Sequence, residues 1–234
     1  MTAVYGVLAQ TLVTRSRLLA LGALGLVAVA IGAAQGAADL FDPARSATRL
    51  IDAYGLSLFA PVVSLVFAAA ALGDPSEDGT LVYLWLRPVR RASIVTAAFA
   101  ASCSVALPVT VIPLVLAALL SSGEPELVTG TLVSSAVAVT AYCALFVWLG
   151  LKTRRSLVWG LAYILIWEGF VARAGDTAAK LAVRAYSRSI LSEMTDVPLN
   201  LAEISFGAAI AVPLLVAVAA LAVASRRLAR QDVA

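Results

Sequence analysis

Residues 73–94 read GDPSEDGTLVYLWLRPVRRASI, and they concentrate charge in a chain that carries little of it. Six charged side chains fall within the stretch, namely Asp74, Glu77, Asp78, Arg87, Arg90 and Arg91. The sequence on both sides is almost continuously apolar. We therefore predict a water-exposed loop between two membrane-spanning segments, around which the rest of the chain is arranged.

This loop has the signals of a short helix. Asp74 followed by Pro75 is typical of a helix N-cap and a first helical residue, and Glu77 lies three residues after Asp74, as in a capping box. Pro88 stops a helix shortly after Leu86. The sequence thus predicts a helix from about Pro75 to Leu86.

One face of the predicted helix is apolar. Leu81, Leu84 and Trp85 recur at i, i+3 and i+4, and the acids Glu77 and Asp78 lie near the N-terminus, where the helix dipole favours negative charge. This pattern indicates an amphipathic helix along a membrane surface.

The composition predicts an all-α polytopic membrane protein with one transmembrane domain over residues 1–234. Of the 234 residues, 62% are hydrophobic and 13% are charged, and the mean hydropathy is +0.96. One crossing of a bilayer needs roughly 20 apolar residues. Windows nearly free of charge predict six spans, at about residues 18–38, 53–73, 92–120, 127–151, 156–172 and 204–225.

Shorter helices are expected outside the spans. Residues 3–14 have apolar residues every fourth position and predict an interfacial helix before the first span. Residues 39–52 suggest a short solvated helix in an outer loop. After the fifth span, 177–194 form a basic amphipathic pattern that fits either a solvated surface helix or one that dips into the outer interface.

Basic residues set the predicted orientation. With both termini in the cytoplasm, 11 of the 17 Lys and Arg residues lie in inner segments and the inner side carries a net charge of +7, against −4 outside. The positive-inside rule then predicts an inner or plasma membrane protein whose termini and 73–94 loop are cytoplasmic. The membrane accounts for the basic balance, so no nucleic acid is implied.

The first span carries Ala28, Gly32 and Gly36 at four-residue spacing. Small residues at this spacing let another helix backbone approach closely. Packing within the chain is one interpretation, and a homodimer seam is the other.

Glu168 is the acidic residue that falls inside a predicted span. An ionisable group at this depth normally faces the interior of a bundle and has a partner. Arg173, Arg184 or Arg188 are candidates for that partner, in a structural pair at the outer mouth. Contact with a substrate or ion is the alternative, and Trp167 is included with Glu168, Arg184 and Arg188 as a candidate for the pathway.

Autonomous enzyme chemistry is not expected. The chain has no His, which removes the common general bases and metal ligands. Its two lysines, Lys152 and Lys180, lie in no P-loop pattern. Cys103 and Cys143 fall within spans as packing residues, so we predict no catalytic residue, no metal site and no cofactor in this chain.

The loop also resembles a known family. Glu77, the run Gly79-Thr80-Leu81, Leu84, the run Arg87-Pro88-Val89-Arg90-Arg91 and Ile94 are similar in spacing and position to a loop of the type-2 ABC exporter permeases. Arg90 stands where that family often has a small hydroxyl residue. Trp167-Glu168-Gly169, followed by Tyr186-Ser187, is similar to some bacterial members.

The resemblance implies a six-helix exporter half that begins with an elbow helix. Two permeases, as a homodimer in lipid, would each bind a cytoplasmic ATPase subunit, and ATP and Mg would be bound on that partner. The 75–87 helix would be the coupling helix. Its implied coupling residues are Asp74, Glu77, Asp78, Gly79, Thr80, Leu81, Leu84, Trp85, Arg87 and Pro88.

Two other functions remain open from the residues alone. A gradient-driven carrier is one, although such proteins often have several intramembrane acids and an internal repeat. A non-transporting membrane scaffold is the other. The substrate is not specified, because apolar spans suit a lipid or an amphiphilic drug without excluding a peptide.

Overall fold

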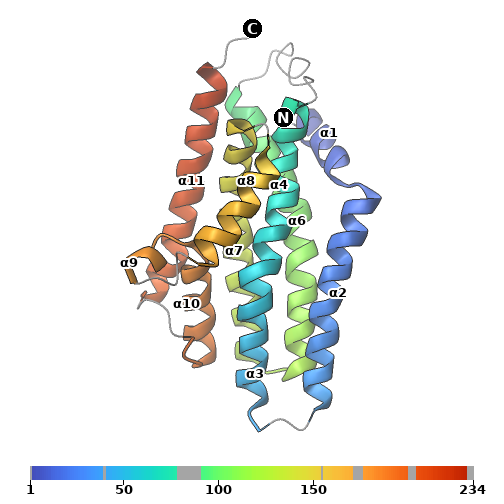
Figure 1. Cartoon of the computed structure of the whole chain (residues 1–234), viewed down its shortest axis with the longest axis vertical. Helices are drawn as coiled ribbons and strands as arrows, with labels where there is room; N and C mark the ends of the chain where they lie inside the picture. Colours follow the sequence, from blue (N-terminus) through green and yellow to red (C-terminus); the bar gives the residue numbers. More distant parts are fainter. Residues whose placement is uncertain are drawn as a thin grey trace.

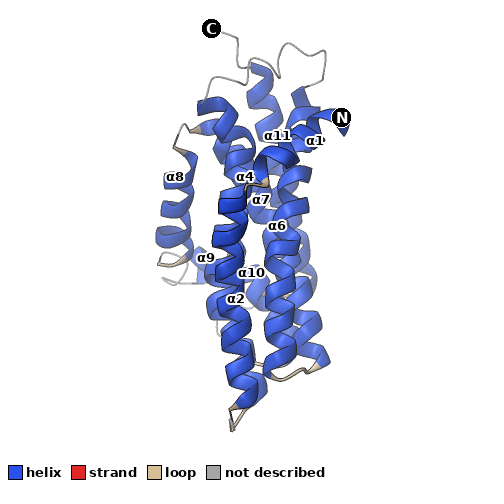
Figure 2. Cartoon of the chain, turned by 90° about the vertical axis from the view of Figure 1, so that its right-hand side faces the viewer, coloured by secondary structure: helices blue, strands red, loops and turns tan. Residues whose placement is uncertain are grey.

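The structure is a computed structural model, and it describes residues 2–38, 41–77, 91–153, 155–170, 176–199 and 204–230. Within these ranges the chain forms helices joined by short turns, and it contains no strand. The helices lie side by side in an elongated bundle (Figures 1 and 2). The all-α membrane fold predicted from the composition is confirmed.

Five helical segments are long and apolar enough to cross a membrane. They are α2 (Arg15–Ala37), the continuous run α3 (Pro43–Leu50), η1 (Ile51–Phe59) and α4 (Ala60–Glu77), then α6 (Arg91–Ser121), α7 (Pro125–Lys152) and α11 (Phe206–Arg230). They correspond to the predicted spans at 18–38, 53–73, 92–120, 127–151 and 204–225. Each of these five predicted spans therefore coincides with a helix that is long and apolar enough to cross a membrane.

The remaining predicted span, 156–172, is not one full-length helix. The chain forms α8 (Ser156–Ala162) and the π-helical η2 (Tyr163–Glu168), which together reach only about 20 Å at ~1.5 Å per residue. The hydrocarbon core is ~30 Å thick. The chain then continues through α9 (Asp176–Ala179) and α10 (Val183–Thr195).

Figure 1 shows how the two halves are arranged. The α8 segment lies in the half of the bundle that holds α1 and the C-terminal end of α11, and α10 lies in the half towards α3. α10 packs against α7 and α11 rather than standing off the bundle. The fifth crossing is thus built from α8 and η2 on one side and α10 on the other.

Of the two alternatives for 177–194, this position disfavours the solvated surface helix and favours the helix that dips inward. Arg184 and Ser187 are buried in α10, whereas Leu181, just before it, is 67% exposed. α10 buries Ile190 and Leu191 as well, and within this helix Glu193 is exposed, so Arg184 and Ser187 lie on the same packed face as its apolar residues. Buried polar side chains of this kind need partners inside the bundle, because lipid offers them none.

The chain begins with a helix at the position predicted for residues 3–14. α1 (Thr2–Leu12) packs on α6 and buries Leu8 and Leu12, while the Tyr5 hydroxyl lies 3.0 Å from Ser104 Oγ of α6. α1 is therefore fixed to the bundle at the end where α11 also finishes (Figure 1).

The small residues of α2 face α6 of the same chain. A Cβ added to Gly32 would lie 2.5 Å from the Ala117 carbonyl oxygen, and one added to Gly36 would overlap the Leu120 carbonyl oxygen. Ala28 is fully buried. The backbones of α2 and α6 thus approach closely along this ladder, which supports its interpretation as packing within the chain.

The prediction that a separate loop helix begins at Pro75 is wrong. α4 continues without interruption through Asp74 and Pro75 to Glu77, so Asp74 is not an N-cap. Its carboxylate instead pairs with Arg17 at 2.7 Å. The remainder of the predicted coupling helix, from Asp78 to Leu86, lies outside the described residues.

Candidate functional site

Polar side chains meet around α10, and we call this group the α10 polar cluster. Its members are Asp52, Tyr163, Glu168, Arg184 and Arg188. The two acids, Asp52 in η1 and Glu168 in η2, are 5% and 1% exposed. Both lie in π-helical segments and both bind α10, so two otherwise apolar spans are joined to this helix by buried carboxylates.

Glu168 binds the N-terminus of α10. One carboxylate oxygen accepts hydrogen bonds from the Tyr163 hydroxyl at 3.0 Å and the Val183 N–H at 3.1 Å, and the other accepts from the Arg184 N–H at 3.2 Å. The first N–H groups of a helix have no partner within the helix and carry its positive dipole end. Glu168, at the end of η2, accepts hydrogen bonds from two of these N–H groups, and its negative charge balances the positive end of the α10 dipole.

The π-helical turn explains how Tyr163 reaches Glu168. The two residues are five apart, and a π-helix places residues i and i+5 near one another, as the Gly169 N–H to Ile164 carbonyl bond of 2.9 Å shows at the same turn. In an α-helix this spacing would point the two side chains to different faces. The turn therefore brings the phenol onto the carboxylate.

Asp52 binds the next turn of α10. Arg188 Nε lies 2.5 Å from Asp52 Oδ1, and both side chains are largely buried, at 15% and 7% exposure. A buried pair of this kind fixes the relative position of two helices, because removing either partner leaves a charge in an apolar medium. α10 is thus tied to η1 as well as to η2.

The side chain of Arg184 also belongs to the α10 polar cluster, in addition to the N–H that binds Glu168. The residue is 7% exposed, and its Nε has no hydrogen-bond partner among the described residues. The phenol of Tyr142, on α7, is fully buried, and its hydroxyl also has no hydrogen-bond partner among the described residues. A cationic side chain is therefore held inside the bundle beside the break in the fifth crossing.

The structure assigns the predicted site residues differently from the sequence. Glu168 has backbone and tyrosine donors rather than an arginine partner, and Arg188 pairs with Asp52 instead. Arg184 binds Glu168 through its N–H, and Arg173 lies outside the described residues. Trp167 precedes Glu168 in η2, and its side chain makes no hydrogen bond or ring contact to other described residues.

Sequence reasoning missed Asp52 and Tyr163. Asp52 was placed in a solvated outer loop, whereas it is buried one residue before a charge-free window. Its position directly beside that window was a usable signal. Tyr163 had none, because its proximity to Glu168 depends on the π-helical turn.

The two described flanks of the 78–90 segment are each bonded to another helix. Asp74, near the end of α4, pairs with Arg17 in the first turn of α2. Arg91, the first residue of α6, donates from Nη1 to the Leu228 carbonyl oxygen of α11 at 2.7 Å. Both flanks lie at the same end of the bundle as α1 and the end of α11 (Figure 1).

Glu77 is the other predicted coupling residue within the described ranges. Glu77 ends α4. The rest lie outside the described residues, namely Asp78, Gly79, Thr80, Leu81, Leu84, Trp85, Arg87 and Pro88.

The chemistry of the described site is structural and electrostatic. Glu168 accepts three hydrogen bonds and is 1% exposed, so in this structure it joins η2 to α10. Across the described ranges, no three Cys, Asp or Glu side chains gather in a metal-binding arrangement.

Comparison with known proteins adds the family. A search of curated proteins found no match. A family model described as "ABC-2 family transporter protein" matches residues 10–173, which include α2, α4, α6, α7 and α8. The match covers most of the chain and the whole of the 73–94 loop, and ABC-2 permeases work with a cytoplasmic ABC ATPase subunit. The chain is therefore a multi-pass membrane protein that belongs to the ABC-2 transporter family.

Proposed function

We propose that this chain is the permease subunit of an ABC exporter, and that segment 75–87 binds a cytoplasmic ATPase. The family match over residues 10–173 carries the proposal. The chain has no P-loop of its own, so ATP and Mg would be bound by the partner. Both termini and the 73–94 loop would lie in the cytoplasm.

The bonded flanks of the loop support a role in coupling. A force applied to residues 78–90 passes to α2 through the Asp74–Arg17 pair and to α11 through the Arg91–Leu228 bond. Movement of an ATPase against this segment would therefore shift α2, α4, α6 and α11 together. Leu81, Leu84 and Trp85 would supply the apolar contact, with Glu77 and Arg87 at its rim.

The pathway would form between two copies of the chain. Asp52, Glu168 and Arg184 are buried within the bundle of one copy, and an exporter half of this size would need a second copy to enclose a route. We assign Arg184 as the side chain most suited to an exported anion, because its Nε is buried without a hydrogen-bond partner in the described structure. Glu168 and Arg188 would position α10 beside that route.

The coupling role is tested with Glu77→Lys and Leu84→Asp. Each variant is reconstituted with its ATPase, and we expect the substrate-stimulated ATP hydrolysis to be lost while the permease still inserts and elutes as a folded protein. Reversing the charge of Glu77 or placing a carboxylate in the apolar contact removes the binding surface.

Matched controls separate this result from general damage. Glu126→Lys makes the same charge change at an exposed position at the other end of the bundle, and Leu84→Ile keeps the apolar contact. Both should retain stimulation. Normal stimulation in Glu77→Lys and Leu84→Asp, or ATP-independent transport by the chain alone, would overturn the proposal.

A further inference from the structure

We propose that a pocket between α7 and α8 binds one anionic phospholipid of the surrounding bilayer. The headgroup would lie at Lys152, and an acyl chain would fill the apolar interior. The inference rests on the pocket alone and does not depend on the proposed exporter function.

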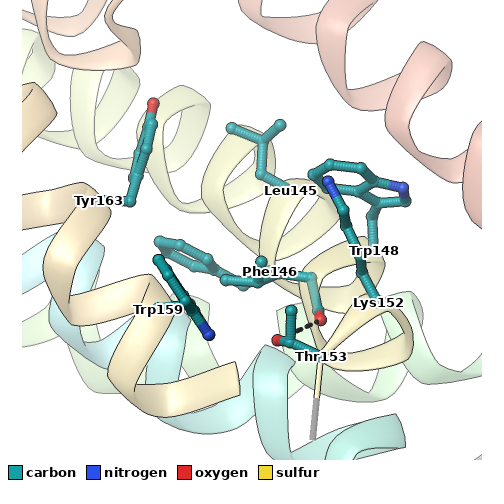
Figure 3. Close-up of a pocket in the computed structure, with 8 residues that line it drawn as sticks. Leu145, Phe146, Trp148, Lys152, Thr153, Trp159 and Tyr163 are labelled. Atoms are coloured by element: carbon teal, nitrogen blue, oxygen red, sulfur yellow. Dashed lines mark hydrogen bonds between the residues drawn. The ribbon is translucent and has the colours of Figure 1, made fainter. Parts of the chain in front are cut away.

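The pocket has the size and lining of a binding site. Its volume is about 370 Å³, within the ~300–1,000 Å³ of typical small-molecule sites. Figure 3 shows Phe146 of α7 between Tyr163 and Trp159, on the wall that faces α8. Phe146 and Tyr163 meet edge to face, with ring centroids 6.2 Å apart. The walls are therefore mostly aromatic and aliphatic.

The position of the pocket fits the edge of a bilayer. It begins at Lys152, the last residue of α7, and extends along α7 to Leu145, a depth of about 10 Å at ~1.5 Å per residue. The facing helix α8 begins beside it and presents Trp159, which is 60% exposed. An apolar pocket open at this depth meets acyl chains rather than water.

Charge selects the kind of lipid. The ammonium of Lys152 lies 4.7 Å from the centroid of the Trp148 ring, so a cation is held at the end of the apolar pocket. Arg155, also exposed, follows three residues later. Cations next to an apolar pocket between transmembrane helices recognise anionic headgroups, because phosphate replaces part of the water that surrounds the ammonium.

The test uses quenching of tryptophan fluorescence by lipids with brominated acyl chains. A Trp85→Phe/Trp167→Phe variant keeps Trp148 and Trp159, the two tryptophans of the pocket, as the fluorophores. It is reconstituted in symmetric vesicles that contain equal small fractions of brominated phosphatidylglycerol or brominated phosphatidylcholine. We expect stronger quenching by the anionic lipid.

Two further variants test the residues. Lys152→Gln should reduce the preference for phosphatidylglycerol about fivefold, as expected for one cation near an anionic headgroup, whereas Lys152→Arg should keep it. The matched control is Lys180→Gln, because Lys180 is the other lysine of the chain, is exposed and does not line the pocket. Leu145→Trp should displace the bound lipid, because the larger side chain fills the pocket. Native mass spectrometry of the protein released from vesicles measures how much lipid stays bound.

Each remaining outcome overturns the proposal. Equal quenching by both lipids would mean ordinary contact with the lipid around the protein. Quenching by neither would mean that a protein, such as a second copy of this chain, covers the pocket. A preference that survives Lys152→Gln would place the anionic lipid elsewhere.

Discussion

At the residue scale, Glu168 shows how a charged side chain is accommodated inside a membrane protein. It has no ion-pair partner among the described residues, yet three donors surround its carboxylate, two of them from the start of α10. Hydrogen bonds to a charged group contribute more than those between neutral groups, and the dipole of α10 adds to them. Glu168 therefore stabilises the break in the fifth crossing.

Glu168→Gln should lower the free energy of unfolding by about 1–3 kcal/mol, because the amide loses the charge and brings its own donors towards the N–H groups of α10. Tyr163→Phe removes one donor and should have a smaller effect, about 1 kcal/mol. The measurement is thermal unfolding in detergent.

The control for this prediction is Glu193→Gln, which makes the same change at an exposed position on α10. It should stay within about 0.5 kcal/mol of the parent. Equal stability of Glu168→Gln and the parent would show that the three hydrogen bonds do not hold α10.

At the element scale, the helices are joined in two different ways. α2 packs on α6 through small residues, with Gly25 against the ring of Pro113 and Gly32 against the backbone at Ala117. α10 is held by polar bonds to η1 and η2. Van der Waals packing suits helices that stay together in lipid. α10 is shorter and has less surface to pack, and its polar bonds to η1 and η2 fix its position.

Gly32→Val should separate α2 from α6 and lower stability by about 1–3 kcal/mol, because its Cβ alone would lie 2.5 Å from the Ala117 carbonyl oxygen. Gly22→Val is the matched control on the same helix, where an added Cβ meets nothing within 4 Å. Thermal unfolding and size-exclusion chromatography should be measured together. If Gly32→Val instead left the stability unchanged and dissociated a dimer, the ladder would be a seam between chains.

At the scale of the whole molecule, charge separates the two ends of the bundle. The end with α1 and the last turns of α11 holds basic residues, namely Arg15, Arg17, Arg91, Lys152, Arg155, Arg226 and Arg227. The opposite end holds the acids Asp42, Glu124 and Glu126 together with Arg45 and Arg49 of α3, so the basic excess lies at the end with α1. With the composite fifth crossing, α1 and the end of α11 lie on one side, as an even number of crossings requires. The positive-inside rule predicts that this side is cytoplasmic.

Labelling of introduced cysteines tests this orientation. In a background of Cys103→Ala and Cys143→Ala, Glu124→Cys should react with a membrane-impermeant maleimide in intact cells, and Arg226→Cys only after the cells are opened. Both positions are exposed at opposite ends of the bundle. The reverse pattern would place the 73–94 loop outside and exclude binding of a cytoplasmic ATPase.

The sequence by itself determined the class of the protein, five of the crossings and the loop that links it to its family. These properties follow from composition and from runs of apolar residues, which the bilayer imposes on any chain that spans it. The resemblance carried by the 73–94 loop is confirmed by the family match over residues 10–173.

The tertiary structure alone decided the arrangement of the polar residues. Hydropathy does not show that α8 and η2 stop halfway, that Asp52 turns inward, or that Arg188 pairs with Asp52 while Glu168 binds backbone donors. These contacts join residues as many as 136 positions apart, as for Asp52 and Arg188. The physical reason is that a charge in lipid must find a partner wherever the folded chain supplies one, and that depends on distances in space rather than along the sequence.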